Sequence, residues 1–213
     1  MCGRYKRKSS RRQIVEAFDL KEGLEAPCDA EEDISPGSLQ PVVYSGDAGV
    51  RCMERMRWGF KMPDRLLFNA RCEGIDRSSF WRGSFETRRC MIPADAFYEW
   101  EKLKQGRKYE FGVPGNNLFA MAGIWASWKN LKTGEAERAF AILTTRANAT
   151  MLPVHNRQPV ILEPSDYAEY LSQAVSPPTH LLRVLADDGL ELKRIQPDGL
   201  RSVQTNLFES HSG

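Results

Sequence analysis

The chain has 213 residues, of which 41% are hydrophobic and 27% are charged, and its formal net charge is +2. This length suffices for one sizeable domain or two small ones, and the ordinary composition excludes collagen-like and disordered classes. The N-terminal cations are not followed by an apolar segment, and no stretch approaches the roughly 18 consecutive apolar residues of a membrane span. We therefore expect neither a secretory signal nor a membrane anchor.

Charge is distributed unevenly along the chain. Residues 1–12 hold six cations and no acid, residues 13–50 hold nine acids and one lysine, and residues 51–89 hold ten cations and five acids. Two arginine-rich blocks fit a polyanionic partner, because guanidinium groups bind phosphate through two hydrogen bonds. The alternative is a surface of mixed charge, in which the acidic block pairs with both basic blocks.

The cysteines favour a reducing compartment. They are five in number, at positions 2, 28, 52, 72 and 90, and no two of them form a C-x-x-C pair. Neither a disulfide framework nor a metal site is therefore expected. A cytoplasmic location is the simplest that fits.

The first half of the chain begins with a short helix. Two serines precede residues 11–18, whose apolar residues share one face, and this pattern is typical of a capped helix. Residues 20–34 are acidic and irregular, and a turn follows at 35–37. Residues 42–45 and 50–58 predict a hairpin through 46–49, and residues 66–70 predict a further strand.

The second half is also rich in strands. They are predicted at 90–93, 109–113, 118–127, 139–145 and 159–162, followed by helices at 165–174 and 179–186 and short strands at 190–195 and 201–205. Many strands without βαβ alternation predict one α+β domain over residues 1–213, with a curved, mostly antiparallel, barrel-like sheet flanked by a few helices. About the last eight residues are expected to form a flexible tail.

The opening residues Met1-Cys2-Gly3-Arg4 suggest a reactive terminus. If Met1 is removed, Cys2 carries a thiol and a free α-amine on one residue, which no internal residue can do. The unperturbed pKa values are about 8 for the amine and about 8.5 for the thiol. Arg4 is expected to favour the thiolate and to attract anionic substrates. The alternative is an ordinary cysteine on a frayed terminus.

Polar residues interrupt apolar strands at three places, and such breaks mark candidate functional residues because burial of polar groups costs free energy. Asn69 and Arg71 share one side of a strand. Glu99, between two aromatic residues, is a partly desolvated carboxylate suited to acid–base chemistry. His155, in a loop-like segment, is the most natural proton carrier near neutral pH. The alternatives are a strand cap with a surface ion pair, a Glu99–arginine pair and a histidine satisfied by the backbone.

Several short motifs, taken in order, resemble the SRAP family, the SOS-response-associated peptidases that process abasic sites. The motifs are Cys2-Gly3-Arg4, Pro36-Gly37, Trp58-Gly59, Asn69-Ala70-Arg71-Cys72-Glu73, Arg89-Cys90 through Pro93-Ala94, Phe97-Tyr98-Glu99-Trp100 and His155-Asn156-Arg157-Gln158-Pro159. Each motif alone is weak, whereas their joint occurrence in this order is specific. The segment 203–206 resembles a weakened form of the family's closing segment.

The resemblance implies a protein that binds abasic sites in single-stranded DNA and links to them covalently, shielding the lesion during the DNA damage response. After autocatalytic removal of Met1, the Cys2 amine would form a Schiff base with the opened sugar, and its thiolate would close a thiazolidine. Asn69 would position the terminus. Glu99 would move protons at the amine, and His155 would protonate the sugar ring oxygen.

The resemblance also implies a set of DNA-binding residues. Arg4, Arg71 and Arg157 would hold phosphates flanking the lesion. Thr144 would add a contact, and Pro36 and Trp58 would shape the groove. A protein of this bacterial or phage type would lie in the cytoplasm, associated with the nucleoid when bound to DNA, and we expect a monomer without metal or cofactor.

Two features depart from the family pattern. Asp33-Ile34-Ser35-Pro36 stands where the family usually has Asn-x-Ala-Pro, and this introduces an acid that repels phosphate. The loop 60–65 is short and lacks the tryptophans that some members use for stacking on bases, a contact that contributes roughly 1–3 kcal/mol per base. We therefore expect DNA binding to depend more on Arg65 and Arg77.

Two other functions are compatible with the opening residues and the basic blocks. Class II glutamine amidotransferases also begin Met-Cys-Gly and use the thiolate, but their downstream Gly-His-Thr-Arg type signal is not found here; release of ammonia from glutamine would favour them. A non-covalent single-stranded DNA-binding module would bind intact and abasic strands alike and leave no covalent product.

Overall fold

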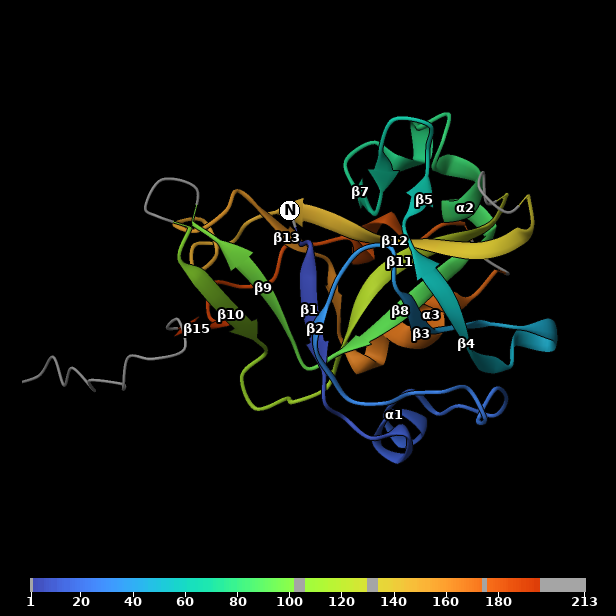
Figure 1. The fold of residues 1–213 in the computed structure, drawn as a ribbon, viewed down its shortest axis with the longest axis horizontal. Helices are drawn as coiled ribbons and strands as arrows, with labels where there is room; N and C mark the ends of the chain where they lie inside the picture. Colours follow the sequence, from blue (N-terminus) through green and yellow to red (C-terminus); the bar gives the residue numbers. More distant parts are fainter. Residues whose placement is uncertain (1, 102–105, 130–133, 174–175, 196–213) are drawn as a thin grey trace, which may run out of the picture.

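The structure, a computed structural model, describes residues 2–101, 106–129, 134–173 and 176–195 (Figure 1). The strands are β1 (Arg4–Arg7), β2 (Glu31–Ile34), β3 (Leu39–Ser45), β4 (Arg51–Trp58), β5 (Phe60–Lys61), β6 (Leu66–Leu67), β7 (Asn69–Arg71), β8 (Arg89–Ala94), β9 (Ala96–Trp100), β10 (Lys108–Gly112), β11 (Phe119–Lys129), β12 (Ala136–Arg146), β13 (Arg157–Pro159), β14 (Ile161–Leu162) and β15 (Glu191–Ile195). The helices are α1 (Arg11–Phe18), α2 (Arg82–Thr87) and α3 (Tyr167–Leu171), with short 3₁₀ turns between elements.

Five strands close into a barrel in the order β4, β3, β8, β11 and β12. The ring closes because β12 pairs with β11 on one side and, in parallel, with β4 on the other. The remaining pairings in the ring are antiparallel. At the edges of the barrel, β7 and β13 pair with β12, and β14 pairs with β11. The prediction of a single α+β domain with a mostly antiparallel, barrel-like core is confirmed.

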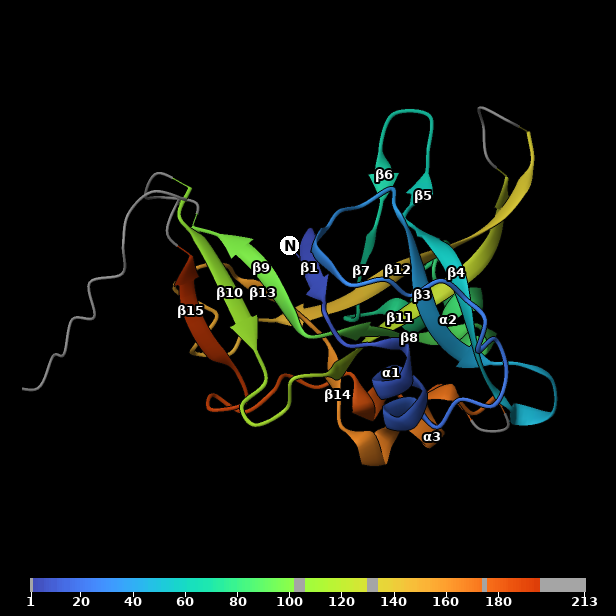
Figure 2. The same ribbon diagram turned by 60° about the horizontal axis from the view of Figure 1, so that its bottom comes forward.

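A second sheet lies beside the barrel and carries the N-terminal strand (Figures 1 and 2). Its strand order is β15, β10, β9, β1 and β2, and all its pairings are antiparallel. Because β1 lies between β9 and the edge strand β2, the segment before Arg4 is placed beside β9.

The barrel strands are buried on both faces. In β12, Phe140 and Ile142 belong to one apolar cluster, whereas Ala141 and Leu143 belong to another, as the alternation of a strand requires. The first cluster includes side chains of β1, β9 and β10, and it also contains Cys2. Cys2 therefore lies in the apolar layer between the barrel and the second sheet.

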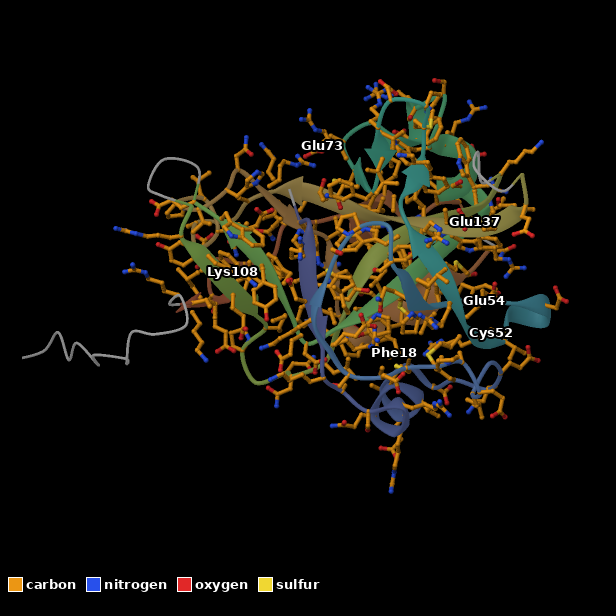
Figure 3. All side chains as sticks on the ribbon, viewed as in Figure 1. Phe18, Cys52, Glu54, Glu73, Lys108 and Glu137 are labelled. Atoms are coloured by element: carbon orange, nitrogen blue, oxygen red, sulfur yellow. The ribbon has the colours of Figure 1, made fainter. Side chains whose placement is uncertain are left out.

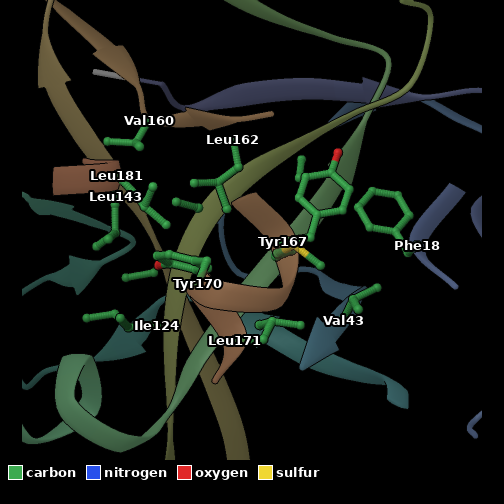
Figure 4. Close-up of a cluster of buried hydrophobic side chains, with 14 of the residues drawn as sticks. Phe18, Val43, Ile124, Leu143, Val160, Leu162, Tyr167, Tyr170, Leu171 and Leu181 are labelled. Atoms are coloured by element: carbon green, nitrogen blue, oxygen red, sulfur yellow. The ribbon is translucent and has the colours of Figure 1, made fainter. Parts of the chain in front are cut away.

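The second cluster joins the barrel to the helices (Figure 4). The predicted helix at 11–18 is confirmed as α1. Ser10 caps it, because its hydroxyl accepts the Gln13 N–H at 3.3 Å while the Gln13 side chain accepts the Ser10 N–H at 2.9 Å. Phe18 at its end stacks on Tyr167 of α3, with ring centroids 5.3 Å apart.

Some predicted elements differ from the structure. Residues 31–34 form β2 instead of an irregular segment, because they pair with β1. The strand predicted at 66–70 is two strands, since β6 pairs with β5 and β7 pairs with β12. The helix predicted at 179–186 is only a 3₁₀ turn, Thr179–Leu181. The predicted strand at 201–205 and the predicted tail lie outside the described residues.

Candidate active site and nucleic-acid interface

Cys2 is held in place by an asparagine from a distant strand. Its residue is fully buried, and its carbonyl oxygen accepts a hydrogen bond from Asn69 Nδ2 at 2.9 Å. Asn69 opens β7, where it lies opposite Ile142 of β12. The candidate residue Asn69 is therefore fixed by the edge of the barrel and contacts the terminal segment directly.

The same contact orients the Asn69 amide. A carbonyl oxygen only accepts hydrogen bonds, so the amide nitrogen must face Cys2 and Oδ1 must point elsewhere. Oδ1 is buried and has no hydrogen-bond partner among the described residues. Because a buried acceptor without a donor costs free energy, this oxygen suits an incoming amine or hydroxyl group.

The Cys2 thiol is protonated in this environment. Burial raises its pKa well above the usual range, and the negative charge of Glu99 raises it further. The thiol approaches the Arg4 carbonyl oxygen at 3.9 Å, whereas the Arg4 guanidinium points to Asp33, 2.8 Å away. The expectation that Arg4 favours the thiolate is wrong, because burial decides the thiol pKa and the Arg4 charge is taken up by Asp33.

Glu99 comes from β9, the strand next to β1. It follows Tyr98, which is the cross-strand partner of Arg4, and so it lies beside the segment that precedes β1. The side chain is buried, with 5% of its residue surface exposed. The negative charge of Glu99 raises the pKa of the Cys2 thiol, after burial itself. The structure thus brings Glu99, Asn69 and Cys2 together.

His155 precedes β13 and is also buried. Its Nδ1 accepts the backbone N–H of Arg157 at 3.0 Å. Nδ1 also lies 3.2 Å from the Arg157 carbonyl oxygen, to which it donates in the other tautomer, so both neutral forms of the ring find a partner in the Arg157 backbone. The backbone N–H of His155 donates to Met151 at 3.0 Å, so the preceding turn fixes the residue from the other side.

Strand β12 connects these polar positions. Along one edge it pairs with β7, with Asn69 opposite Ile142 and Arg71 opposite Thr144. Along the other edge it pairs with β13, so that Arg157 lies opposite its last residue. Segments some 85 residues apart in the sequence therefore meet at one end of the barrel.

Arg157 is buried and tightly held. Its guanidinium donates to both carboxylate oxygens of Glu73, at 2.6 and 2.8 Å, and to the carbonyl and hydroxyl oxygens of Thr144 at 2.5 and 3.2 Å. The guanidinium holds the pKa of Glu73 below its usual range. Arg157 thus supports the site from beneath, and a phosphate would have to compete with Glu73 for it.

Two residues expected at the DNA surface have no exposed side chain. Thr144 is fully buried and bonds to Arg157 and to the Ala70 carbonyl, so the expected contact with DNA is wrong. Trp58 is also fully buried, and its Nε1 donates to the Phe68 carbonyl at 2.9 Å. It can shape a groove only through the residues that cover it.

The other candidates lie at or near the surface. Arg71 at the end of β7, Arg65 in the turn between β5 and β6, and Arg77 are exposed, and Pro36 is half-buried in the turn before β3. Arg77 lies 4.0 Å from the Asp76 carboxylate. Arg71 makes no side-chain hydrogen bond or ion pair with another described residue, so its guanidinium is available to a ligand.

Three functional candidates escaped the sequence reasoning. Glu73 ends the motif at residues 69–73, but the sequence predicted no role for it. Figure 3 shows Glu73 on the segment that follows β7, where it binds Arg157. Arg146, at the exposed end of β12, lies close enough to Glu73 for its charge to lower the pKa of that carboxyl. Asp33 departs from the family pattern, but the sequence did not predict its ion pair with Arg4, because that pair depends on β2, which was not predicted.

Half of the cations of the first basic block pair with β2, in the acidic block that follows it. Three cations of β1 and its extension pair with three consecutive acids of β2. The pairs are Arg4–Asp33, Arg7–Glu31 and Lys8–Glu32. For this block, the alternative of a mixed-charge surface describes the structure better than a free basic patch.

In the described part of the chain, no group of three or more histidine, cysteine, aspartate or glutamate side chains could hold a metal ion. None of the described helices is long and apolar enough to cross a bilayer.

The fold and the site together define a class of protein: a closed barrel with a second sheet that presents a buried, asparagine-held cysteine at the second position of the chain. The chain belongs to the family described as SOS response associated peptidase (SRAP), whose sequence profile matches residues 1–198. The family expected from the motifs is therefore confirmed.

Curated relatives match over nearly the whole chain. The abasic site processing protein YoqW of Bacillus subtilis (strain 168) is 30% identical over 226 residues, covering 99% of this chain and 100% of that one. The abasic site processing protein YedK of Escherichia coli (strain K12) is 25% identical, covering 83% of this chain and 82% of that one.

Solved structures share the fold. A protein from Bacteroides thetaiotaomicron superposes with a TM-score of 0.81 at 19% identity, covering 92% of this chain and 93% of that one. A phage-related protein from Bordetella bronchiseptica gives a TM-score of 0.74 at 25% identity, covering 92% of this chain and 95% of that one.

Proposed function

We propose that this protein recognises abasic sites in single-stranded DNA and attaches to them covalently through Cys2, after its own site has removed Met1. The observation that carries the proposal is the hydrogen bond from Asn69 to the Cys2 carbonyl, beside the buried Glu99. Curated relatives are named as abasic site processing proteins, and this supports an abasic site as the lesion that the protein recognises.

The first step is hydrolysis of the Met1–Cys2 peptide bond. Water adds to the Met1 carbonyl, the C–N bond breaks, methionine leaves with the hydroxyl group, and Cys2 gains a free α-amine. Glu99 would take the proton from water and return it to the leaving amine. Asn69 would hold Cys2 still during this exchange, because its amide is fixed by the Cys2 carbonyl oxygen.

The second step joins the amine to the lesion. An abasic deoxyribose opens to an aldehyde when its ring oxygen is protonated, and His155 would supply that proton. The Cys2 amine attacks the aldehyde carbon, and water leaves to give a Schiff base. The thiol then adds across the C=N bond: sulfur bonds to the carbon, the double bond becomes single, and the thiol proton is transferred to the nitrogen. The sum is aldehyde plus aminothiol giving thiazolidine plus one water.

The raised pKa of the Cys2 thiol favours this order. A buried, protonated thiol is a poor first nucleophile, so attack by the amine precedes attack by sulfur. Glu99, whose negative charge raises the pKa of this thiol, would accept the thiol proton when the ring closes and pass it to the ring nitrogen.

The DNA backbone would cross the end of the barrel where β7 and β12 finish. Arg71 and Arg146 are exposed there and make no ion pair with another described residue, so each is available to a phosphate. Arg65 would extend this contact. Arg157 would keep His155 and Thr144 in position from below.

The test is crosslinking of an abasic single-stranded oligonucleotide, read by denaturing electrophoresis without reductant. The wild-type protein should give a shifted band. Cys2→Ala should give none, because its N-terminal amine can form only a reversible Schiff base, and addition of borohydride should restore a band in this variant. Cys72→Ala, which removes an internal thiol, should crosslink like the wild type.

The result also separates the rival functions. A band of undiminished yield from Cys2→Ala without reductant would refute the thiazolidine. Equal retention of intact and abasic strands, with no covalent product from the wild type, would favour a non-covalent binding module. Release of ammonia from glutamine would favour an amidotransferase-like hydrolase.

A further inference from the structure

The outer face of the second sheet carries an acidic side chain beside the reactive terminus. Arg4, two residues after Cys2, forms an ion pair with Asp33 of β2, with 2.8 Å between Nη1 and Oδ2. Both side chains are accessible, with 40% and 51% of their surface exposed. The cation nearest to the Cys2 backbone in the sequence is thus already occupied by a carboxylate of the same chain.

A second cation faces the other oxygen of the same carboxylate. Lys108 Nζ lies 4.0 Å from Asp33 Oδ1, and Figure 3 shows Lys108 on β10. The Lys108 ammonium is also located over the ring of Tyr98, 3.9 Å from its centroid, and 5.4 Å from the centroid of Trp100. These aromatic contacts hold the ammonium in place. Asp33 therefore lies between two cations, one close and one within reach.

We propose that Asp33 is a competitor for the DNA phosphate at Arg4, which turns to Lys108 when a phosphate arrives. This inference rests on the proposed function, since it takes single-stranded DNA as the partner of the face beside Cys2. A rotation of the Asp33 side chain is sufficient, because its second oxygen already faces the ammonium. The carboxylate then keeps a partner while the Arg4 guanidinium becomes free for the phosphate.

The consequence is selectivity for the lesion. Breaking the Arg4–Asp33 pair costs part of the binding free energy for every strand, intact or abasic, because all strands carry the same phosphates. Only an abasic strand recovers retention through the covalent bond to Cys2. Asp33 thus shortens the residence of the protein on intact DNA without touching the reacting atoms.

The experiment measures the affinity for a labelled, unmodified oligothymidylate by fluorescence anisotropy at several salt concentrations. This probe has no aldehyde, so the measurement does not depend on Cys2 chemistry. Asp33→Asn should bind roughly 3- to 5-fold more tightly, the range expected when an exposed ion pair no longer has to be broken. The slope of log K against log salt should steepen by about 0.7, the value for one more phosphate contact on a single strand.

Glu32→Gln is the matched control. It removes the same charge one residue away on β2, from an acid that pairs with Lys8 instead of Arg4. Its affinity should change much less than that of Asp33→Asn. Lys108→Met should weaken the wild type, because Asp33 then has no second partner, and should have less effect in the Asp33→Asn background.

Each outcome decides the inference. Equal effects of Asp33→Asn and Glu32→Gln, or tighter binding with an unchanged salt slope, would overturn it, even if the wild type crosslinks abasic DNA normally. Tighter binding and a steeper slope would support it, even if no crosslink forms and the proposed chemistry fails. If neither the wild type nor Asp33→Asn binds the oligothymidylate at any salt concentration, both proposals are wrong.

Discussion

Arg157 and Glu73 form the support on which His155 rests. The Arg157 backbone N–H donates to His155 Nδ1, and the guanidinium is fixed by the Glu73 carboxylate and by Thr144. With 9% of its surface exposed, Arg157 depends on these partners to compensate for its lost hydration. A disturbance of Glu73 should therefore reach the His155 ring through the Arg157 backbone.

Glu73→Gln should lower both stability and crosslinking rate. The variant leaves a buried guanidinium without a full counter-charge, but Glu73 itself is half-exposed, so we expect a loss of only about 1–2 kcal/mol in the free energy of unfolding. Crosslinking of abasic DNA should slow several-fold, because His155 loses its fixed orientation. Asp76→Asn, which removes a neighbouring charge 4.0 Å from exposed Arg77, should change neither quantity. Identical behaviour of the two variants would contradict this role.

Strand β1 shows why some elements could not be predicted. Its four residues are three cations and one tyrosine, so their sequence does not show the alternating pattern that predicts a strand. The extended conformation results from pairing with β9 and β2. Residues 31–34 became β2 for the same reason. By contrast, the long barrel strands β11 and β12 were predictable, because their apolar runs carry two buried faces. Strand β4, which alternates apolar and charged residues, was predictable from the turn residues 46–49 that precede it.

The turn between β4 and β5 depends on Gly59. This residue has φ of +111°, and an added Cβ would approach the Leu66 side chain at 2.8 Å. Gly59→Ala should destabilise the protein through both backbone strain and crowding. Gly37→Ala is the control, because Gly37 has φ of +93° but open space around its Cα. Chemical denaturation should give a free energy of unfolding that is roughly 1 kcal/mol lower for Gly59→Ala than for Gly37→Ala. Equal free energies would contradict the crowding at Leu66.

At the scale of the molecule, the candidate site lies between two layers that the sequence could only partly indicate. The abundance of strands predicted an α+β barrel, and breaks in apolar segments identified Asn69, Glu99 and His155. Closure through the parallel pairing of β4 and β12 left no local signal, because the paired residues are about 80 positions apart. The burial of Thr144 and Trp58 follows from that closure, and so it could not be predicted from motifs.

The buried thiols and phenols should make the protein labile to alkali. Burial raises the pKa of Tyr167 to about 12 and that of Cys52 to about 11, and it raises the pKa of Cys90 well above the usual range. The folded state keeps these protons at a pH where the unfolded chain, with cysteine pKa values of about 8.5, releases them. The contribution of these protonated groups to the free energy of unfolding is therefore complete below about pH 8.5 and decreases as the pH rises further.

Thermal unfolding in the presence of a reductant checks this pH dependence. The midpoint should be little affected by these groups between pH 7 and 8 and should fall continuously from about pH 8.5 to 11. Cys90→Ala should unfold with a shallower slope over the alkaline range, since one titrating thiol is gone. A midpoint that stays constant up to pH 11 would contradict the burial of these groups.

The most direct test of the central claim is the intact mass of the protein before and after incubation with an abasic single-stranded oligonucleotide, without reductant. We predict a purified protein that lacks the mass of Met1 and a product heavier by the oligonucleotide minus one water, stable under denaturing conditions. Peptide mapping should locate the adduct at Cys2. An adduct formed by protein that retains Met1, or one seen only after borohydride reduction, would contradict the thiazolidine mechanism.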